Sequence, residues 1–238
     1  MLRRILLASL VLLSHISWGN NVMLSKDLVT KDNISGKWDI AGESEFKSIE
    51  FNECGNYIIS IKIIQQQFVL FGTYEILNNN TIDLSDFGTL IINKFEGNSV
   101  DFTMKKHRGA TRVHELFATK NEHVISNTIK TDLLCRTWKM LKKNGKNVLG
   151  TTDEVTLLFS KTGTYFLNSA HPAETLGHWK WQDDLETKIL YAYKQFSDWS
   201  NEDEIEIIEL SNTVLKIQVH IKGNQKTIYT LIPLVCAK

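Results

Sequence analysis

Polar and apolar residues alternate in short runs along most of the chain, and this pattern predicts β-strands rather than helices. In the run SVDFTM, residues 99–104, the apolar side chains Val100, Phe102 and Met104 share one face and polar residues occupy the other. A period of two is that of a strand with one face against a core and the other toward water. Only two prolines interrupt the 238 residues, while Gly and Asn recur between the runs. The chain is therefore expected to be all-β and antiparallel.

Three pairs of runs predict hairpins in the first half of the chain. They cover residues 48–63 with a turn at Gly55-Asn56, residues 68–84 with a turn at 78–80, and residues 89–104 with a turn at Gly97-Asn98. Gly and Asn are favoured in such turns because they tolerate a positive φ angle. No long helix is expected, although 126–138 predicts one helical turn capped by Ser126 or Asn127.

The second half repeats the order of the first, roughly a hundred residues later. The segment IEFNECGNYIIS corresponds to LLFSKTGTYFLN, which aligns Phe51 with Phe159 and Tyr57 with Tyr165. The later segment GTYEIL corresponds to GHWKWQ. The order is constant while the spacing between the matched runs varies at turns, as expected for two copies of one β fold. We predict a leader at 20–33, a first domain at 34–119, a linker at 120–132 and a second domain at 133–238.

Several residues in both halves are expected to build the fold rather than to bind. A tryptophan on the first strand would close one end of a small barrel beside a glycine, and further glycines would form tight turns. These structural positions are Gly36, Trp38, Gly55, Gly72, Trp138, Gly163 and Gly177.

This combination of short motifs carries a family likeness. A G-x-W at the first strand, an F-x-x-x-G-x-Y hairpin and a G-x-Y/W opening the next strand resemble the lipocalin-like domains of exported Bacteroidota proteins. Arg136 stands where the second copy should have the glycine. The resemblance implies two tandem antiparallel lipocalin-like β-barrels.

The first residues have the character of a secretory signal. Arg3 and Arg4 precede an apolar run at 5–13 that is too short to cross a bilayer, and small residues at Ser17 and Gly19 favour cleavage before Asn20. We therefore predict a signal peptide at 1–19 and an exported product, periplasmic or secreted.

The charges of the chain make two partner classes improbable. The sequence has 27 basic and 27 acidic residues, and removal of Arg3 and Arg4 leaves 25 against 27. Nucleic acid or an anionic membrane surface would need an accumulated basic field. No later apolar run is long enough to cross a membrane, so the product is not expected to be an integral membrane protein.

Three cysteines, Cys54, Cys135 and Cys236, would meet an oxidising compartment. The first and last strands of a closed barrel are neighbours, so a Cys135–Cys236 disulfide is geometrically reasonable. The alternative is three buried thiols.

Aromatic side chains are the best candidates for a ligand site. A barrel of about eight strands either fills its interior with side chains or holds one small ligand. The rings expected near such a ligand are Tyr57, Phe71, Tyr74, Trp179, Trp181, Tyr191 and Tyr193. The alternative is that these rings simply fill the barrels.

No motif indicates catalysis, a metal site or a cofactor, since the sequence has neither a G-x-S-x-G elbow nor a histidine pair at ligand spacing. The leading expectation is a non-enzymatic binding protein with a small hydrophobic ligand in a barrel, as the resemblance implies. The alternative is a cell-envelope protein-interaction module with filled barrels, and an enzyme is the third possibility.

Overall fold

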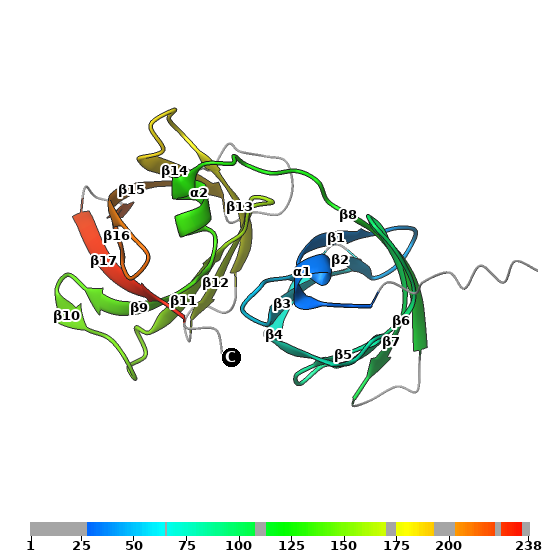
Figure 1. Ribbon diagram of the computed structural model, residues 1–238. Coiled ribbons are helices and arrows are strands. Elements are labelled where there is room, and N and C mark those ends of the chain that lie inside the picture. The colour runs from blue at the N-terminus through cyan, green and yellow to red at the C-terminus, as the bar shows by residue number, and fades with distance from the viewer. Residues whose placement is uncertain are drawn as a thin grey trace, which may run out of the picture.

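Two closed antiparallel barrels of eight strands follow one another along the chain (Figure 1). The structure is a computed structural model that describes residues 28–64, 66–107, 113–169, 175–192, 203–221 and 225–234. The predicted all-β architecture with two tandem antiparallel barrels is confirmed. The predicted signal peptide lies outside the described residues.

The first barrel is a continuous up-and-down meander. Its closing pair joins the first and last strands, with Trp38 opposite Lys120. The strands are β1 (Gly36–Ile40), β2 (Phe46–Phe51), β3 (Asn56–Ile63), β4 (Gln66–Asn78), β5 (Thr81–Leu84), β6 (Gly88–Glu96), β7 (Ser99–Lys106) and β8 (Val113–Lys120).

The second barrel repeats this order and is closed by pairing of its first and last strands, with Pro233 opposite Trp138. A two-residue strand, β10 (Lys146–Asn147), pairs only with the end of β9. The ring consists of β9 (Thr137–Lys143), β11 (Val155–Phe159), β12 (Thr164–Ser169), β13 (Thr175–Trp181), β14 (Lys188–Ala192), β15 (Asp203–Leu210), β16 (Leu215–Ile221) and β17 (Gln225–Pro233).

The strand alternation read from the sequence corresponds to burial in the structure. On β7, Val100, Phe102 and Met104 are buried while the residues between them are partly exposed. The three predicted hairpins are present with their turns between β2 and β3, β4 and β5, and β6 and β7. Gly55 and Gly97 have φ angles of +80° and +54°, which explains glycine at these two turns.

A short helix precedes the first strand of each barrel and lies across one mouth (Figure 1). These are α1 (Lys31–Ile34) and α2 (Ile129–Leu134). The predicted helical turn before the second barrel is present, but its N-cap is Thr128 rather than Ser126 or Asn127. The sequence reasoning missed α1, whose capping box pairs Thr30 with Asn33.

The helices extend each folded unit beyond the domain limits expected from the sequence. Val29 and Ile34 belong to the core of the first barrel. Leu134 belongs to the second core, and Ile125 packs against it. The leader and the linker therefore contribute side chains to the barrels that they precede.

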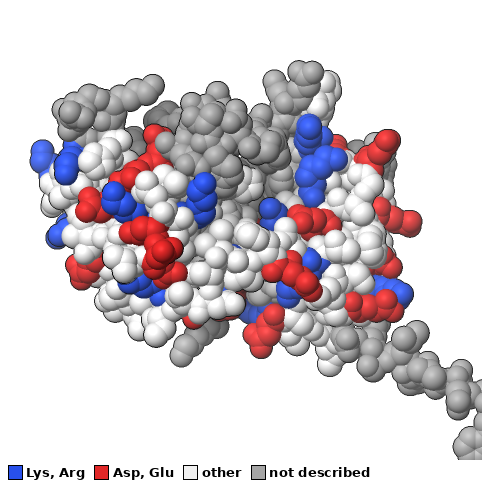
Figure 2. Space-filling model, turned by 90° about the horizontal axis from the view of Figure 1, so that it is seen from above, with Lys and Arg blue, Asp and Glu red and all other residues white. Residues whose placement is uncertain are grey.

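Acidic and basic side chains are interspersed over both barrels on the face that Figure 2 shows. Neither acidic nor basic side chains dominate that face, in keeping with the equal numbers of both in the sequence. Neither described helix has the length and apolar character that a bilayer crossing requires.

Candidate functional site

The indole of each first strand closes its barrel against the preceding helix. Trp38 Nε1 donates to the carbonyl of Ile34 at 2.7 Å, and Trp138 Nε1 donates to the carbonyl of Leu134 at 2.9 Å. Both indoles are completely buried. Each barrel is thus closed at the equivalent mouth by the same hydrogen bond from the indole to a helix carbonyl.

A cation covers each indole, but it comes from a different part of the chain in each copy. In the first barrel Lys120 Nζ lies 5.4 Å from the Trp38 ring. Gly36 has a φ of +112°, and a Cβ there would lie 3.1 Å from the Lys120 side chain. In the second barrel Arg136 itself lies 5.5 Å from the Trp138 ring. Arg136 at the glycine position therefore supplies the cation that β8 supplies in the first barrel.

Two of the predicted ligand rings in the first barrel are packed core residues. Tyr57 Oη donates to the Ser85 carbonyl at 2.8 Å, and Tyr74 Oη donates to the Asn52 carbonyl at 2.9 Å. Both rings are nearly inaccessible, and burial raises the pKa of Tyr74. Gly72 lies against the Tyr57 ring, where an added Cβ would come within 2.8 Å.

The predicted rings of the second barrel form a connected aromatic layer. Trp179 packs edge-on against Phe159 at 5.7 Å and against Trp181 at 5.4 Å between ring centroids. Tyr191 lies 5.2 Å from Tyr165. Trp179 Nε1 donates to the Ser160 carbonyl at 2.9 Å, so its polar edge is also occupied. Tyr193 lies outside the described residues.

The remaining structural glycines occupy equivalent positions. Gly163 has a φ of +83° at the turn that corresponds to Gly55. Gly177 lies opposite Tyr165 in the β12–β13 pair, as Gly72 lies opposite Tyr57 in the β3–β4 pair.

Phe71 does not lie in a barrel interior, contrary to the sequence prediction. It is on the outer face of β4, where it stacks on Phe166 of the second barrel with ring centroids 4.7 Å apart. These two rings belong to an apolar cluster between the barrels, whose other members are Ile58, Val69, Leu158 and Leu176. Successive apolar residues of β4 pack on opposite sides, with Leu70 against the first core and Val69 and Phe71 in this cluster, so alternation of apolar and polar residues could not assign Phe71 to one side.

Polar contacts continue this seam between the barrels. Asn52 Nδ2 donates to Thr137 Oγ1 at 3.2 Å, and Thr162 Oγ1 donates to a Glu50 carboxylate oxygen at 3.0 Å. Glu50 is buried, and His178 is half-buried nearby. Burial lowers the pKa of His178, and the Lys37 ammonium lowers it further.

A cleft of about 740 Å³ opens beside the seam and is lined by both barrels. Its polar walls come from the α1 and α2 segments and from the β2–β3 and β11–β12 turns. Its lining includes Asp32, Glu53, Ile58, Arg136, Leu158 and Lys161. Its volume is that of a ligand site for a small organic molecule or a short peptide. Sequence reasoning missed this cleft, although the aligned turns NECGN and SKTGT already contain two of its charges.

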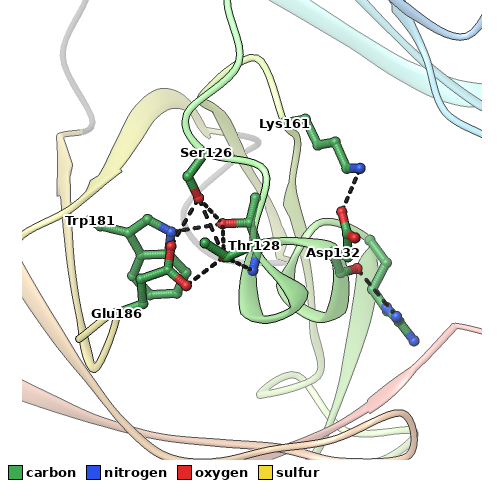
Figure 3. A network of polar contacts seen from close by, with 8 residues as sticks. Ser126, Thr128, Asp132, Lys161, Trp181 and Glu186 are labelled. Atoms are coloured by element: carbon green, nitrogen blue, oxygen red, sulfur yellow. Dashed lines mark hydrogen bonds and ion pairs between the residues drawn. The ribbon is translucent and has the colours of Figure 1, made fainter. Parts of the chain in front are cut away.

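Figure 3 shows how α2 is fixed at one wall of this cleft. Asp132 pairs with Lys161 at 2.5 Å, and this contact raises the pKa of the lysine. Deeper in the barrel mouth, the Glu186 carboxylate accepts from Ser126 Oγ at 2.9 Å and from Thr128 Oγ1 at 2.6 Å. The helix is therefore tied to the β13–β14 turn by hydrogen bonds to a buried carboxylate.

The cysteines differ from the sequence prediction. Cys135 is a free cysteine at the end of α2, so the predicted Cys135–Cys236 disulfide is wrong. β17 does pair with β9, but Cys135 is the C-cap of α2 and lies before β9, outside that strand pair. Cys54 is disulfide-bonded, and Cys236 lies outside the described residues. Burial raises the pKa of Cys135 to about 12.

Among the described residues, no group of three or more His, Cys, Asp and Glu side chains could hold a metal ion. His114 lies 3.9 Å from a Glu45 carboxylate oxygen at the mouth of the first barrel opposite α1, and His178 lies at the seam. These two histidines are therefore in different parts of the molecule.

Comparisons with known proteins leave the family open. No protein-family profile and no curated protein matches this chain. A solved structure of a protein of unknown function from the DUF3598 family of Nostoc punctiforme is similar over 87% of this chain and 100% of that chain. Its sequence identity is 9% and the TM-score is 0.24, and a similarity at that level supports no argument.

Proposed function

We propose that this chain is an exported, non-enzymatic interaction module built from two lipocalin-like barrels. The filling of the barrels supports this function over a carrier with a ligand inside a barrel. Inward-facing positions hold large side chains that are almost completely buried, among them Trp38, Phe46 and Phe102 in the first barrel and Trp138 and Trp179 in the second.

The predicted ligand rings are engaged with the chain itself. The hydroxyls of Tyr57 and Tyr74 and the indole of Trp179 already bond to backbone carbonyls. A hydrophobic ligand would have to displace these rings and leave buried polar atoms without partners, which costs free energy. The cleft described above, in contrast, lies outside both interiors and is bordered by both copies.

The two copies also suit an interaction module. Apolar and hydrogen-bonded contacts join the barrels along the seam, so their outer surfaces are presented together in one arrangement. Preorganised surfaces bind without the cost of ordering two separate domains.

A titration with oleate separates the module from the carrier. We expect no saturable change in tryptophan fluorescence and no rise in melting temperature on addition of oleate to the mature chain. A protein retained from an envelope extract should then bind the mature chain saturably after both are purified. One-to-one binding of oleate that is abolished by Ile59→Trp inside the first barrel, but not by Phe117→Ala on its exposed outer face, would refute the module and support a carrier.

A further inference from the structure

We propose that the cleft between the barrels binds an extended peptide segment with an amine or other cation at one end and a carboxylate at the other. This inference rests on the proposed function, because it assigns the interaction to one surface. It is carried by the charges that the two copies contribute to opposite walls of the cleft.

The cleft is built from equivalent positions of the two copies. Asp32 before the first barrel corresponds to Asp132 before the second, and the turn residues Asn52 and Glu53 correspond to Ser160 and Lys161. The floor includes the buried residues Ile58 and Leu158. The two walls of the site are therefore equivalent surfaces of the two copies.

The two walls differ in the sign of their charge. Glu53 of the first copy is answered by Lys161 of the second, and Gly36 is answered by Arg136. The first wall contains the carboxylates of Asp32, Glu50 and Glu53, while the second contains two cations and one carboxylate. The cleft is therefore negatively charged on the wall of the first copy and carries two cations on the wall of the second.

The charges on each wall are only partly compensated within the chain. Asp132 is committed to Lys161. In the described part of the chain, Asp32 and Glu53 form no ion pair, and Arg136 donates only to the carbonyls of Asp132 and Asn212, at 3.4 and 3.5 Å. Two carboxylates and one guanidinium are thus available to opposite charges of a ligand.

The uncharged lining is suited to a peptide backbone between those ends. Asn52, Asn56, Ser160 and Thr162 place amide and hydroxyl groups in the lining. These groups also bond within the chain, so a peptide N–H or C=O group would use their remaining donor and acceptor positions. The buried apolar side chains of the floor would contact small side chains. A volume of about 740 Å³ is within the usual range for sites that enclose most of a small ligand.

A thermodynamic cycle with tetra-alanine tests the proposal on the mature chain. The four probes are the unblocked peptide, the N-acetylated peptide, the C-amidated peptide and the peptide with both blocks. Calorimetry at low ionic strength should show that each block weakens binding by about fivefold, near the upper end for a partly exposed ion pair.

Variants of the protein identify which wall of the cleft binds which terminus of the peptide. For Glu53→Gln, the N-acetylated peptide should bind as tightly as the unblocked peptide. For Arg136→Gln, the C-amidated peptide should bind as tightly as the unblocked peptide. The controls are Lys105→Gln on β7 and Glu115→Gln on β8. Each removes one charge of the same sign as Arg136→Gln or Glu53→Gln but away from the cleft, so the affinities for all four peptides should be unchanged.

Equal affinities for the four peptides, no binding of any of them, or effects that do not couple to Glu53 and Arg136 would overturn the peptide assignment. The proposed function would survive that result if a purified envelope protein binds the chain. Conversely, saturable oleate binding inside a barrel would refute the module whatever the peptides do, so the two failures are distinguishable.

Discussion

At the residue scale, the departure of the second copy from the G-x-W pattern has a physical explanation. Gly36 leaves room for Lys120, whose ammonium covers Trp38, whereas Arg136 covers Trp138 from its own position. The strand position opposite Trp138 is Pro233, which has no cation to offer. Each indole is thus covered by a cation, which β8 supplies in the first barrel and the residue just before β9 supplies in the second.

The partly buried thiol of Cys135 gives a prediction with a defined pH dependence. Its pKa is raised by burial from 9.0 to about 12 in the folded chain, so between those values the unfolded chain loses the proton while the folded chain keeps it. The free energy of unfolding should therefore fall as pH rises through this window. Denaturant titrations from pH 8 to 11 on the native protein and on Cys135→Ser measure the difference.

The matched variant isolates the thiol from lysines and tyrosines that titrate in the same range. Cys135→Ser should show a shallower decline of the free energy of unfolding with pH. An equally steep decline in Cys135→Ser would show that this thiol does not contribute to the pH dependence.

At the scale of elements, the hairpins and the two helices show which features can be predicted from local sequence. The strand hairpins were predictable because Gly55 and Gly97 mark turns between runs with a clear period of two. α1 has four residues and was not predicted, because one turn of helix has too little periodicity to recognise. The cap of α2 is Thr128 because this residue bonds both the helix and Glu186, a partner 58 residues away.

The two helix caps should differ in their contribution to stability. Thr30→Ala removes only a cap hydrogen bond to Asn33 N and should lower the free energy of unfolding by about 1 kcal/mol. Thr128→Ala also removes a donor from the buried Glu186 carboxylate and should cost about 2–3 kcal/mol. Urea unfolding of both variants, with the exposed Thr213→Ala as control, measures the two costs. Equal losses for Thr30→Ala and Thr128→Ala would show that Glu186 gains nothing from Thr128.

At the scale of the whole molecule, the seam decides whether the barrels act as one body. Phe166 is completely buried and its ring stacks on Phe71 of the other barrel. The surrounding cluster draws on β3 and β4 of one barrel and on β11, β12 and β13 of the other. We expect these contacts to couple the unfolding of the two barrels.

Removal of the Phe166 ring should uncouple them. Phe166→Ala should cost about 3 kcal/mol and resolve the thermal transition into two, because each barrel keeps its own core. Differential scanning calorimetry of this variant and of Phe117→Ala, which removes an exposed ring from β8, makes the comparison. A single transition in Phe166→Ala, as cooperative as in the unmodified chain, would show that other contacts carry the coupling.

The sequence by itself determined the strands, the hairpin turns, the duplication and the identity of the two sealing indoles. These features repeat with a short period or between aligned copies, and local backbone preferences are enough to specify them. Only the tertiary structure decided that Phe71 packs against the second barrel, that Cys135 is unpaired and that Glu53 and Arg136 share a cleft. Those outcomes depend on contacts between surfaces distant along the chain, and alternation within a strand does not distinguish an interior from an interface when both faces are buried.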